Sequence, residues 1–577
     1  MNKKILVILV LILVFVFSTT ALASLTFTTD AITGTSNSAI DLGTGNTLYF
    51  QNTNNGPITT GTGLVTLGGS LTVTGSATFP TLVANRIPLI STGGLITSDA
   101  GIITQGVAGE QKIVGTANAT FTVCASNSLN KNKCDYVATG TADEVTIQAA
   151  IDALPATGGR VILMDGTFNT TSAILTRYGL WLQGQGAGTI IQAGAGTWAP
   201  NRAVIVAKND AAVKGATAGN DITVSDMTIN IGGLANVAGV YSWGYASAST
   251  NVAVRRCKIK NSGASGYGVY GTTSADLTVS NSWFETLGDS AIEVRASTRT
   301  SVIGNAFNSV GALQVYADAG SGGVTMTGNL LYNSSVFGTY STGVYISGFT
   351  FTSNIFKRGA GSSAALTLKN MDGAVVTGNV FDNSAETSAF SNAMVILSSV
   401  SPVTRNVIIA NNTFSLGTAS SGAISYPGIQ VSGADVAIIS ENMIYTPGTT
   451  TSTGILVDNA AAAGVVIEGN TIKGAGAGAS RVGISVASAT GVHLEGNHFD
   501  TLETGVSVAA SATGTRVVGP LWTTSVTVPI TNSGTGTKYA GISSLLPTYA
   551  DNTAALAGGL VAGDPYRTAT GVFMVTY

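Results

Sequence analysis

The amino-acid sequence predicts an all-β fold: a right-handed parallel β-helix over residues 141–518, preceded by a β-rich stalk region. Three observations predict this solenoid. A six-residue unit recurs at intervals of 23 to 33 residues, one position of that unit is repeatedly asparagine, and a single amphipathic helix stands ahead of the repeats. A stack of short coils requires each of these features.

The recurrent unit begins and ends with a large apolar residue. Its copies are VSDMTI (224–229), VRRCKI (254–259), VSNSWF (279–284), VIGNAF (302–307), MTGNLL (326–331), FTSNIF (351–356), VTGNVF (376–381), IANNTF (409–414), ISENMI (439–444), IEGNTI (467–472) and LEGNHF (494–499). The fourth position of the last eight copies holds Asn305, Asn329, Asn354, Asn379, Asn412, Asn442, Asn470 and Asn497, whereas the first three hold Met227, Cys257 and Ser282. Inward asparagines at equivalent turns can hydrogen-bond along the stack, so we expect a structural Asn ladder.

A second short strand is predicted after each unit. Examples are residues 291–294, 343–346, 428–431, 454–457 and 483–486. Two or three strands in each repeat fit one coil of a parallel β-helix. Propeller blades need about 40 residues, and leucine-rich repeats need a leucine consensus, so neither of these folds fits.

A helix is predicted from Thr141. Thr141 and Glu144 have the spacing of a capping box, and apolar residues follow at helical intervals as far as Leu154. Pro155 and the glycine pair at 158–159 end the helix. We expect this helix to cover the apolar core at the open end of the solenoid.

The amino terminus predicts secretion. Residues 1–23 combine two lysines, an apolar run over 5–17 and an Ala-x-Ala site, which is the pattern of a signal peptide. An uncleaved anchor is the alternative, and no later run approaches the roughly 20 apolar residues of a membrane span. We therefore expect an extracellular or cell-surface protein with no membrane span after cleavage. The net charge of −3 gives no general attraction to nucleic acid.

Two cysteines lie in a predicted linker over residues 120–140. Cys124 and Cys134 flank a polar segment and would pair in an oxidising compartment. Spacing alone leaves both the disulfide and two free thiols open. Cys257 occupies an inward position of the repeat, which predicts a buried structural thiol.

The stretch DYVATGTADEVTIQAAIDALPATGGRVILMDGTF (135–168) resembles the first coil of right-handed β-helix proteins of the pectin-lyase-like superfamily. With the Asn-bearing coils, the resemblance covers about two thirds of the chain. It implies the fold strongly and the activity weakly, because this fold hosts lyases, hydrolases, tailspikes and adhesins. The calcium-binding aspartates of pectate lyases and the Arg-x-Lys signature of polygalacturonases have no counterpart in the sequence, which argues against pectinolytic activity. We also expect no metal and no cofactor.

Both ends of the chain resemble phage fibre proteins. Residues 70–100 lie in the stalk region, predicted over 24–119, and resemble tail-fibre segments; residues 549–577 resemble a short tail at the carboxyl end of fibre and tailspike proteins. The resemblance implies that the segment over 519–577 caps the solenoid or joins copies of the chain. A homo-oligomer, such as a trimer, and a monomer both remain open.

Outward side chains of successive coils form rows about 4.8 Å apart. The second strands predict a row that begins with Tyr241 and Tyr270 and a second row two residues further along each strand. Aromatic faces beside charged groups suit sugar rings, although such residues also sit well on any exposed strand. The predicted ligand-binding residues are Tyr241, Tyr270, Glu293, Arg295, Gln314, Tyr316, Tyr345 and Lys369, with Thr367 and Gln430 continuing the first row.

The best predicted catalytic cluster consists of Glu285, Asp289 and Glu293, since glycoside hydrolysis needs two carboxylates about 5 to 9.5 Å apart. Acids in loops more often solvate a turn. The basic run of Arg255, Arg256, Lys258 and Lys260 would suit an anionic polysaccharide, or it is a solvated edge.

Three functions remain open from the sequence. We expect first a non-enzymatic extracellular fibre or adhesin that presents a carbohydrate- or surface-binding face. The first alternative is a polysaccharide lyase or glycoside hydrolase of tailspike or pectate-lyase-like type. The second is a purely structural surface-layer component. The expected partner is accordingly a polysaccharide or a cell-surface glycan.

Overall fold

The computed structural model describes most of the chain beyond residue 118. The described ranges are 102–105, 112–115, 119–199, 201–210, 217–244, 248–308, 311–317, 322–332, 335–341, 345–357, 365–384, 393–398, 403–417, 426–446, 452–460, 462–475, 481–541 and 546–577; in 102–105, 112–115, 311–317, 335–341 and at 426 only the backbone is described. The predicted signal peptide and most of the predicted stalk region therefore lie outside the described residues. The chain divides into two units, Met1–Ile96 and Thr97–Tyr577, and every described residue belongs to the second unit.

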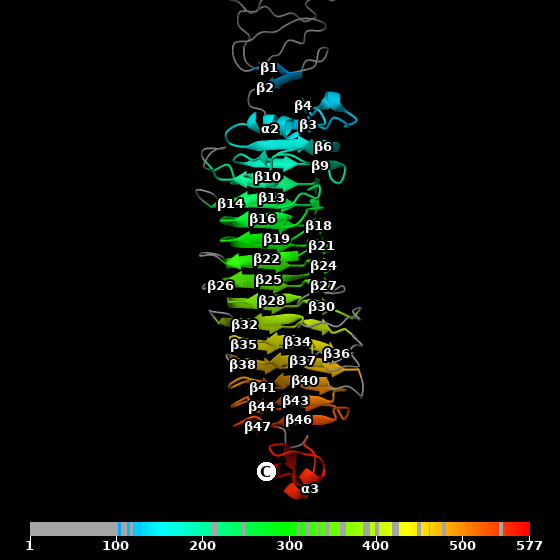
Figure 1. Ribbon diagram of the computed structural model, residues 1–577, viewed down its shortest axis with the longest axis vertical. Helices are drawn as coiled ribbons and strands as arrows, with labels where there is room; N and C mark the ends of the chain where they lie inside the picture. The colour runs from blue at the N-terminus through cyan, green and yellow to red at the C-terminus, as the bar shows by residue number, and fades with distance from the viewer. Residues whose placement is uncertain are drawn as a thin grey trace, which may run out of the picture. The chain divides into compact units, whose positions relative to one another are not determined.

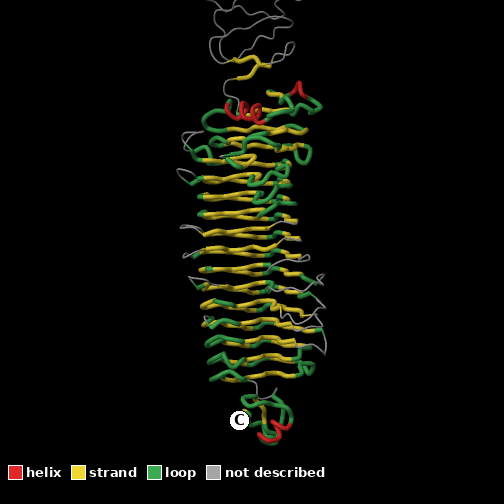
Figure 2. The backbone as a smooth tube through the Cα atoms, viewed as in Figure 1, coloured by secondary structure: helices red, strands yellow, loops and turns green. Residues whose placement is uncertain are grey.

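The body of the second unit is a parallel β-solenoid built from three stacked sheets (Figure 1, Figure 2). Each full coil gives one strand to each sheet, in the order sheet 1, sheet 2, sheet 3, before the chain rises to the next coil. Ahead of these coils, the two short strands β1 (Ile102–Gln105) and β2 (Lys112–Gly115) pair antiparallel.

Sheet 1 contains β4 (Tyr136–Val137), β3 (Thr120–Cys124), β5 (Gly159–Leu163), β8 (Leu180–Gln183), β11 (Ile222–Ser225), β14 (Ser249–Arg255), β17 (Ser274–Ser280), β20 (Thr298–Ile303), β23 (Gly322–Thr327), β26 (Ile346–Thr352), β29 (Met371–Thr377), β32 (Thr404–Ala410), β35 (Ala434–Ser440), β38 (Ala463–Glu468), β41 (His493–Glu495), β44 (Arg516–Val518) and β47 (Lys538–Ala540).

Sheet 2, with 14 described strands, contains β6 (Gly166–Thr170), β9 (Thr189–Ala193), β12 (Thr228–Asn230), β15 (Lys258–Lys260), β18 (Trp283–Glu285), β21 (Ala306–Asn308), β24 (Leu330–Tyr332), β27 (Ile355–Lys357), β30 (Val380–Asp382), β33 (Thr413–Ser415), β36 (Met443–Thr446), β39 (Thr471–Gly474), β42 (His498–Asp500) and β45 (Leu521–Trp522).

Sheet 3, also with 14 described strands, contains β7 (Ile174–Leu175), β10 (Ala203–Lys208), β13 (Ala238–Trp243), β16 (Val269–Thr272), β19 (Ser290–Arg295), β22 (Gly311–Ala317), β25 (Ser335–Ser341), β28 (Leu366–Lys369), β31 (Val395–Ser398), β34 (Tyr426–Val431), β37 (Ser452–Val457), β40 (Arg481–Val486), β43 (Thr504–Val508) and β46 (Val528–Asn532).

The six-residue units are the corners between sheets 1 and 2. Their first residues pair from coil to coil, for example Val279 with Val302 and Val302 with Met326. Their last residues form an apolar column inside sheet 2. Phe381 in this column stacks 5.3 Å from Phe356 and 4.7 Å from Phe414, measured between ring centroids. The core is thus a stack of like side chains, which explains why the repeat is visible in sequence.

The asparagines between these apolar ends form the predicted ladder. The backbone N–H of Asn305 donates to Oδ1 of Asn329 at 2.8 Å, and the side-chain amide of Asn305 donates to the same oxygen and to the carbonyl of Val279. The pattern of Asn-to-Asn bonds continues to Asn497. Because each buried amide is hydrogen-bonded to its neighbours, these bonds offset the cost of removing the amides from water.

The residue before each ladder asparagine adopts a left-handed conformation. Gly304 has φ of 64°, Gly469 of 63° and Asn411 of 56°. Glycine and asparagine tolerate this region best, so the frequent Gly-Asn pairs in the repeat follow from the turn itself.

The ladder has defined ends. Upstream, the N–H of Ser282 donates to Oδ1 of Asn305, and the N–H of Cys257 donates to Oγ of Ser282. Downstream, Leu494 pairs with Val517, which puts buried Pro520 at the position equivalent to Asn497.

The parallel sheets begin at β3 and end at β47, so they reach beyond the predicted range of 141–518 at both ends. Helix α2 (Glu144–Asp152) packs over the first coils and buries Ile147 and Ile151 in the core. The predicted capping box was wrong. Glu144 instead accepts hydrogen bonds from Thr171 and Ser172, and Asp143 accepts from Gly140 and Asn169. Through Asn169, Thr171 and Ser172, the two carboxylates tie the start of the helix to β6 and to the residues that follow it.

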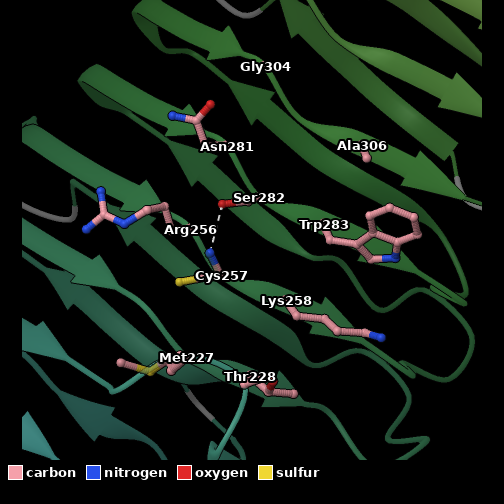
Figure 3. Close-up of a pocket in the computed structure, with 12 residues that line it drawn as sticks. Met227, Thr228, Arg256, Cys257, Lys258, Asn281, Ser282, Trp283, Gly304 and Ala306 are labelled. Atoms are coloured by element: carbon pink, nitrogen blue, oxygen red, sulfur yellow. Dashed lines mark hydrogen bonds between the residues drawn. The ribbon is translucent and has the colours of Figure 1, made fainter.

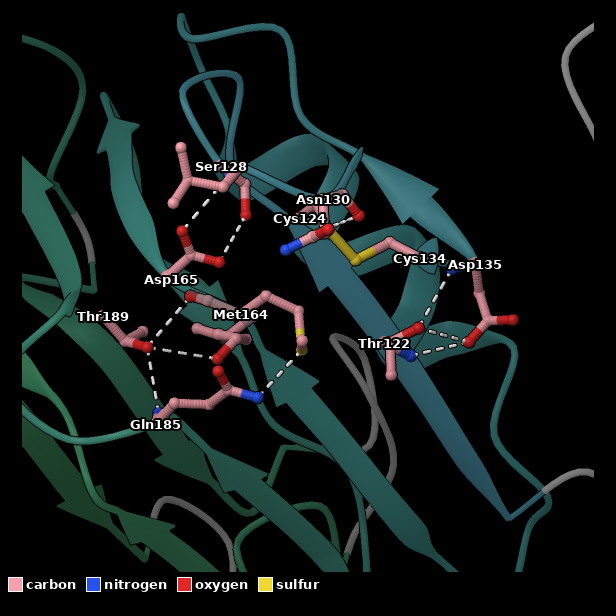
Figure 4. Close-up of a disulfide and its surroundings, with 12 residues drawn as sticks. Thr122, Cys124, Ser128, Asn130, Cys134, Asp135, Met164, Asp165, Gln185 and Thr189 are labelled. Atoms are coloured by element: carbon pink, nitrogen blue, oxygen red, sulfur yellow. Dashed lines mark hydrogen bonds between the residues drawn. A yellow bond between two sulfur atoms is a disulfide. The ribbon is translucent and has the colours of Figure 1, made fainter. Parts of the chain in front are cut away.

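A disulfide joins Cys124 to Cys134 at the start of the solenoid, with Cα atoms 5.7 Å apart (Figure 4). The loop that it closes is held by Asp165, which lies in the bend between β5 and β6 and accepts from Ser128 Oγ at 2.8 Å and from the Leu129 N–H. The two cysteines that the sequence left open are therefore paired in the structure.

The carboxyl-terminal segment contains α3 (Asn552–Ala557) and an antiparallel pair, β48 (Pro565–Arg567) with β49 (Phe573–Val575). It meets the last coil through the N–H of Asn532, which donates to Asp564.

Candidate functional site

The outward row of sheet 3 follows from its strand register. Tyr241 lies beside Tyr270, Tyr270 beside Glu293, and Glu293 beside Gln314. The row then continues through Gly338 to Thr367, and later coils place Gln430 in it. In the second row Arg295 lies beside Tyr316. The side chains of Gln314 and Tyr316 lie outside the described residues.

Tyr345 was wrongly assigned to this row. The strand of its coil in sheet 3 is β25, and Ile346 already begins β26 of sheet 1, pairing with Met371. Residues 343–346 match the alternation of a second strand, but β26 starts five residues ahead of its six-residue unit and leaves no room for a turn. Tyr345 instead packs against the guanidinium of Arg405, 4.5 Å from the ring centroid.

Four aromatic side chains form a cluster on the solvent face of β13 and β16, which we call the aromatic cluster: Tyr241, Trp243, Tyr267 and Tyr270. The ring of Tyr241 stacks on Trp243 at 5.3 Å with an interplanar angle of 3° and lies 4.8 Å from Tyr270. Tyr267 stacks on Tyr270 at 5.1 Å. All four are half-buried, so each ring keeps part of its surface open to solvent.

Small apolar side chains support the cluster. The tyrosines pack on buried Ala203, Val206 and Ala238 of β10 and β13. These short side chains let the rings lie low over the sheet. Burial raises the pKa of Tyr241 and of Tyr267, so both phenols stay neutral hydrogen-bonding groups over the physiological range.

An ion pair borders the cluster on β19. Glu293 is 1% exposed, and its Oε1 lies 2.7 Å from Nε of Arg295, whose guanidinium also reaches the ring of Tyr270 at 6.0 Å. Burial raises the pKa of Glu293, and the hydrogen bond from Arg295 opposes that rise without cancelling it. The charge of Asp289 acts in the same direction as burial.

A second ion pair borders the cluster on β10. The ammonium of Lys208 lies 2.7 Å from Asp210 and 4.2 Å above the ring of Trp243. The arrangement is thus a band of four rings with a carboxylate and a cation at each side. Such a band can stack sugar rings and bind their hydroxyl groups.

The structure separates the three predicted catalytic acids. Glu285 lies on β18 in sheet 2, where its Oε1 is 2.9 Å from Lys258, whereas Glu293 lies on β19 in sheet 3. Partial burial of Glu285 disfavours its charge, but hydrogen bonds from Lys258 and Trp283 outweigh this and lower its pKa. The prediction grouped the three acids by proximity in sequence, and the corner between sheets 2 and 3 turns their strands onto different faces. Only Asp289 remains near Glu293.

Lys369 lies two residues beyond Thr367 on β28, three coils away from β19 and so about 14 Å along the stack. It is outside the aromatic cluster.

Four residues of this site were not identified from the sequence: Trp243, Tyr267, Lys208 and Asp210. Trp243 was detectable, because it stands two residues after Tyr241 in the same alternation; Tyr267 lies in a loop, where no periodicity marks it.

Among the described residues, no group of three or more His, Cys, Asp or Glu side chains is arranged to hold a metal ion. In the same part of the chain, every helix is too short or too polar to cross a bilayer.

Comparisons with solved structures find other β-helix proteins. The A-module of mannuronan C-5 epimerase AlgE4 from Azotobacter vinelandii is 17% identical, over 69% of this chain and 96% of that chain, with a TM-score of 0.36. The tailspike protein of E. coli bacteriophage HK620, in complex with a pentasaccharide, is 14% identical over 69% and 75%, with a TM-score of 0.41. The catalytic domain of a GH87 alpha-1,3-glucanase, in complex with nigerose, is 12% identical over 67% and 67%, with a TM-score of 0.38. A search of curated proteins finds no match.

A family model described as the right handed beta helix region matches residues 238–414 and 391–541, together more than half of the chain. The matched residues include the ladder asparagines and the strands of the aromatic cluster. The chain belongs to the right-handed β-helix family.

Proposed function

We propose that this protein is an extracellular carbohydrate-binding β-helix and that its aromatic cluster holds a polysaccharide chain. The observation that carries the proposal is the stack of Tyr241, Tyr270 and Tyr267 on the solvent face of sheet 3, with ion pairs at both sides. Half-buried rings that keep an open face lose little conformational entropy on binding, because their packing has already fixed them.

Binding of an oligosaccharide panel by calorimetry tests this function. We expect Tyr241→Ala and Tyr270→Ala each to weaken the best ligand about tenfold, which corresponds to about 1.4 kcal/mol. Tyr332→Ala is the matched control, because Tyr332 is 49% exposed on β24 of sheet 2, away from the cluster. Equal affinity of all four proteins would overturn the proposal.

The runner-up function is a polysaccharide lyase or hydrolase at the same face. It is favoured by the raised pKa of Glu293, since a carboxyl group that keeps its proton to a higher pH than an ordinary glutamate is better suited to act as a general acid. New reducing ends or unsaturated sugars, lost in Glu293→Gln while binding persists, would establish the enzyme. Ligand binding without products would favour the adhesin.

We also propose that the protein acts outside the cytoplasm. The disulfide between Cys124 and Cys134 supports this, because disulfides persist mainly in oxidising compartments. The test is the amino-terminal sequence of the protein recovered from culture medium, which is expected to start near Ser24.

We propose further that copies of the chain associate through the carboxyl-terminal segment. Several large apolar or aromatic side chains of this segment are exposed to solvent: Leu556, Val561, Val572, Phe573, Val575 and Tyr577. Such a patch supports chain-to-chain contact.

A further inference from the structure

A groove of about 400 Å³ lies at the corner between sheets 1 and 2, away from the aromatic cluster (Figure 3). Small-molecule sites commonly occupy about 300–1,000 Å³, so one or two sugar residues fit this space. The lining residues that could contact a ligand or shape the space include Arg256, Cys257, Lys258, Asn281, Trp283 and Ala306.

Trp283 forms an aromatic wall of the groove. Its side chain is 43% exposed, and its indole Nε1 donates to Glu285 at 2.9 Å, which fixes the orientation of the ring. Its neighbours in the outward row of sheet 2 are Lys258 on one side and Ala306 on the other. The next coils of this row hold the larger Leu330 and Ile355, so Ala306 gives the groove its room.

Two cations, Arg256 and Lys258, also line the groove. Arg256 binds Asp226 through Nε and Nη2, and Lys258 binds Glu285. A guanidinium has five N–H donors and an ammonium has three, so each keeps donors beyond those that its carboxylate takes. The charge of Lys260 also acts on Glu285, so that carboxylate is shared by two cations.

Asn281 adds a neutral polar group at the rim. It is exposed, and the structure gives its side-chain amide no hydrogen-bond partner within the described residues. Cys257 at the floor supplies packing only: burial raises the pKa of its thiol to about 12, so it stays protonated and unreactive.

We infer that this groove is a second carbohydrate site, which binds a carboxylated sugar residue of an acidic polysaccharide. The pyranose ring stacks on Trp283 and its carboxylate accepts hydrogen bonds from Arg256 and Lys258. The basic run of the sequence, Arg256 to Lys260, then forms part of a binding site. The site shares no residue with the aromatic cluster, so the two proposals stand or fall separately.

The test measures how the fluorine NMR signal of Trp283 responds to added sugars. The full-length protein carries five tryptophans, and 5-fluorotryptophan labelling gives a fluorine NMR signal for each, with that of Trp283 assigned from Trp283→Phe. The probes are tetrasaccharides of galacturonate, mannuronate and glucuronate, together with the methyl ester of each as its neutral counterpart. We expect at least one acidic probe to shift the Trp283 signal, its methyl ester to bind at least tenfold more weakly, and 0.5 M NaCl to weaken binding, because salt screens the contact.

Single substitutions distinguish residues that bind the probe from residues that lie beside the groove. Trp283→Ala and Asn281→Ala are expected to weaken the acidic probe about tenfold and threefold, respectively, whereas Leu330→Ala, in the same outward row, leaves its affinity unchanged. Tyr241→Ala should leave the Trp283 shift unchanged, whether or not the aromatic cluster binds sugar, because the two sites share no residue. A Trp283 signal that no acidic probe moves would overturn the inference, and equal binding of acid and ester would overturn its charge selectivity.

Discussion

The side-chain amide of Asn379 donates to Oδ1 of Asn412 at 2.9 Å, although 33 residues separate them. Elsewhere Asn305 and Asn329 make the same contact across 24 residues. The coils thus differ in length while the corner geometry stays constant. Extra residues enter the loops, and the ladder keeps the register.

Removal of one ladder member should destabilise the solenoid. Asn379→Ala leaves the backbone N–H and the side-chain amide of Asn354 without their acceptor. A buried donor without a partner costs about 1–3 kcal/mol, so we expect a loss of at least about 2 kcal/mol in the free energy of unfolding. Chemical denaturation followed by circular dichroism measures it. Thr413→Ala, at an exposed outward position, is the control, and an equal effect of both variants would contradict a structural role for the ladder.

The phenylalanine column should be equally sensitive. Phe381 is fully buried between Phe356 and Phe414. Phe381→Ala is expected to cost about 3–5 kcal/mol and Phe381→Leu much less, because leucine fills most of the cavity. The same denaturation experiment ranks the two variants. A smaller loss in the free energy of unfolding for Phe381→Ala than for Phe381→Leu would mean that the neighbouring side chains collapse into the cavity.

The pH dependence of stability should contain a contribution from Glu293. Burial raises its pKa in the folded state above the ordinary value near 4.5, so the folded protein holds this proton more tightly than the unfolded chain. The resulting stabilisation is complete below pH 4.5 and is lost as the pH rises through the raised pKa. Glu293→Gln cannot ionise, and its stability relative to the native protein should increase over that interval. Carbon NMR of the Glu293 carboxyl group should show a midpoint above 4.5, and a midpoint at or below 4.5 would refute the shift.

Loss of the disulfide should loosen one end of the solenoid only. The bond between Cys124 and Cys134 closes a loop with a sequence separation of 10. Loop-closure entropy predicts a contribution of about 2–3 kcal/mol. In Cys124→Ser/Cys134→Ser, hydrogen exchange of β3 and β5 should accelerate while the central strands near β26 keep their protection. Uniform acceleration along the stack would show that the first coil controls the whole solenoid.

A charge in the carboxyl-terminal patch should separate the copies. Phe573 is 38% exposed and lies 6.1 Å from the ring of Tyr539 of the last coil. Phe573→Asp is expected to reduce the molar mass measured by light scattering to that of one chain. Thr570→Asp, on an exposed turn nearby, controls for added charge. A single-chain mass for the native protein would exclude association altogether.

The sequence revealed the fold because a solenoid repeats its core. Apolar column, ladder and turn recur in each coil, so local pattern and tertiary position coincide at Asn305 as at Asn497. The second strands were predictable in the same way where their spacing from the ladder is regular. The prediction failed at Tyr345, where one alternating segment lies too close to the next unit to form a strand of sheet 3.

The candidate site was predictable only in part. Alternation put Tyr241, Tyr270 and Glu293 on one outward row, and the register agrees. The sequence did not predict that Glu285 and Glu293 lie on different faces. The repeat pattern does not show that a corner of the coil falls between these two residues. The capping role of Thr141 failed for a related reason, since the acceptors at the start of α2 serve donors from another coil.

The proline that follows the ladder has a consequence for the column of asparagines. The backbone N–H of each asparagine in the column donates to the side-chain oxygen of the asparagine in the next coil, whose own N–H needs an acceptor in turn. Pro520 has no side-chain acceptor to offer Asn497 and no N–H of its own that needs one, so the column of Asn-to-Asn bonds stops at Asn497. The imino acid thus ends this column, whereas the parallel strand pairing continues through β45, β46 and β47. Side-chain order at this corner and backbone pairing in the sheets therefore end at different coils.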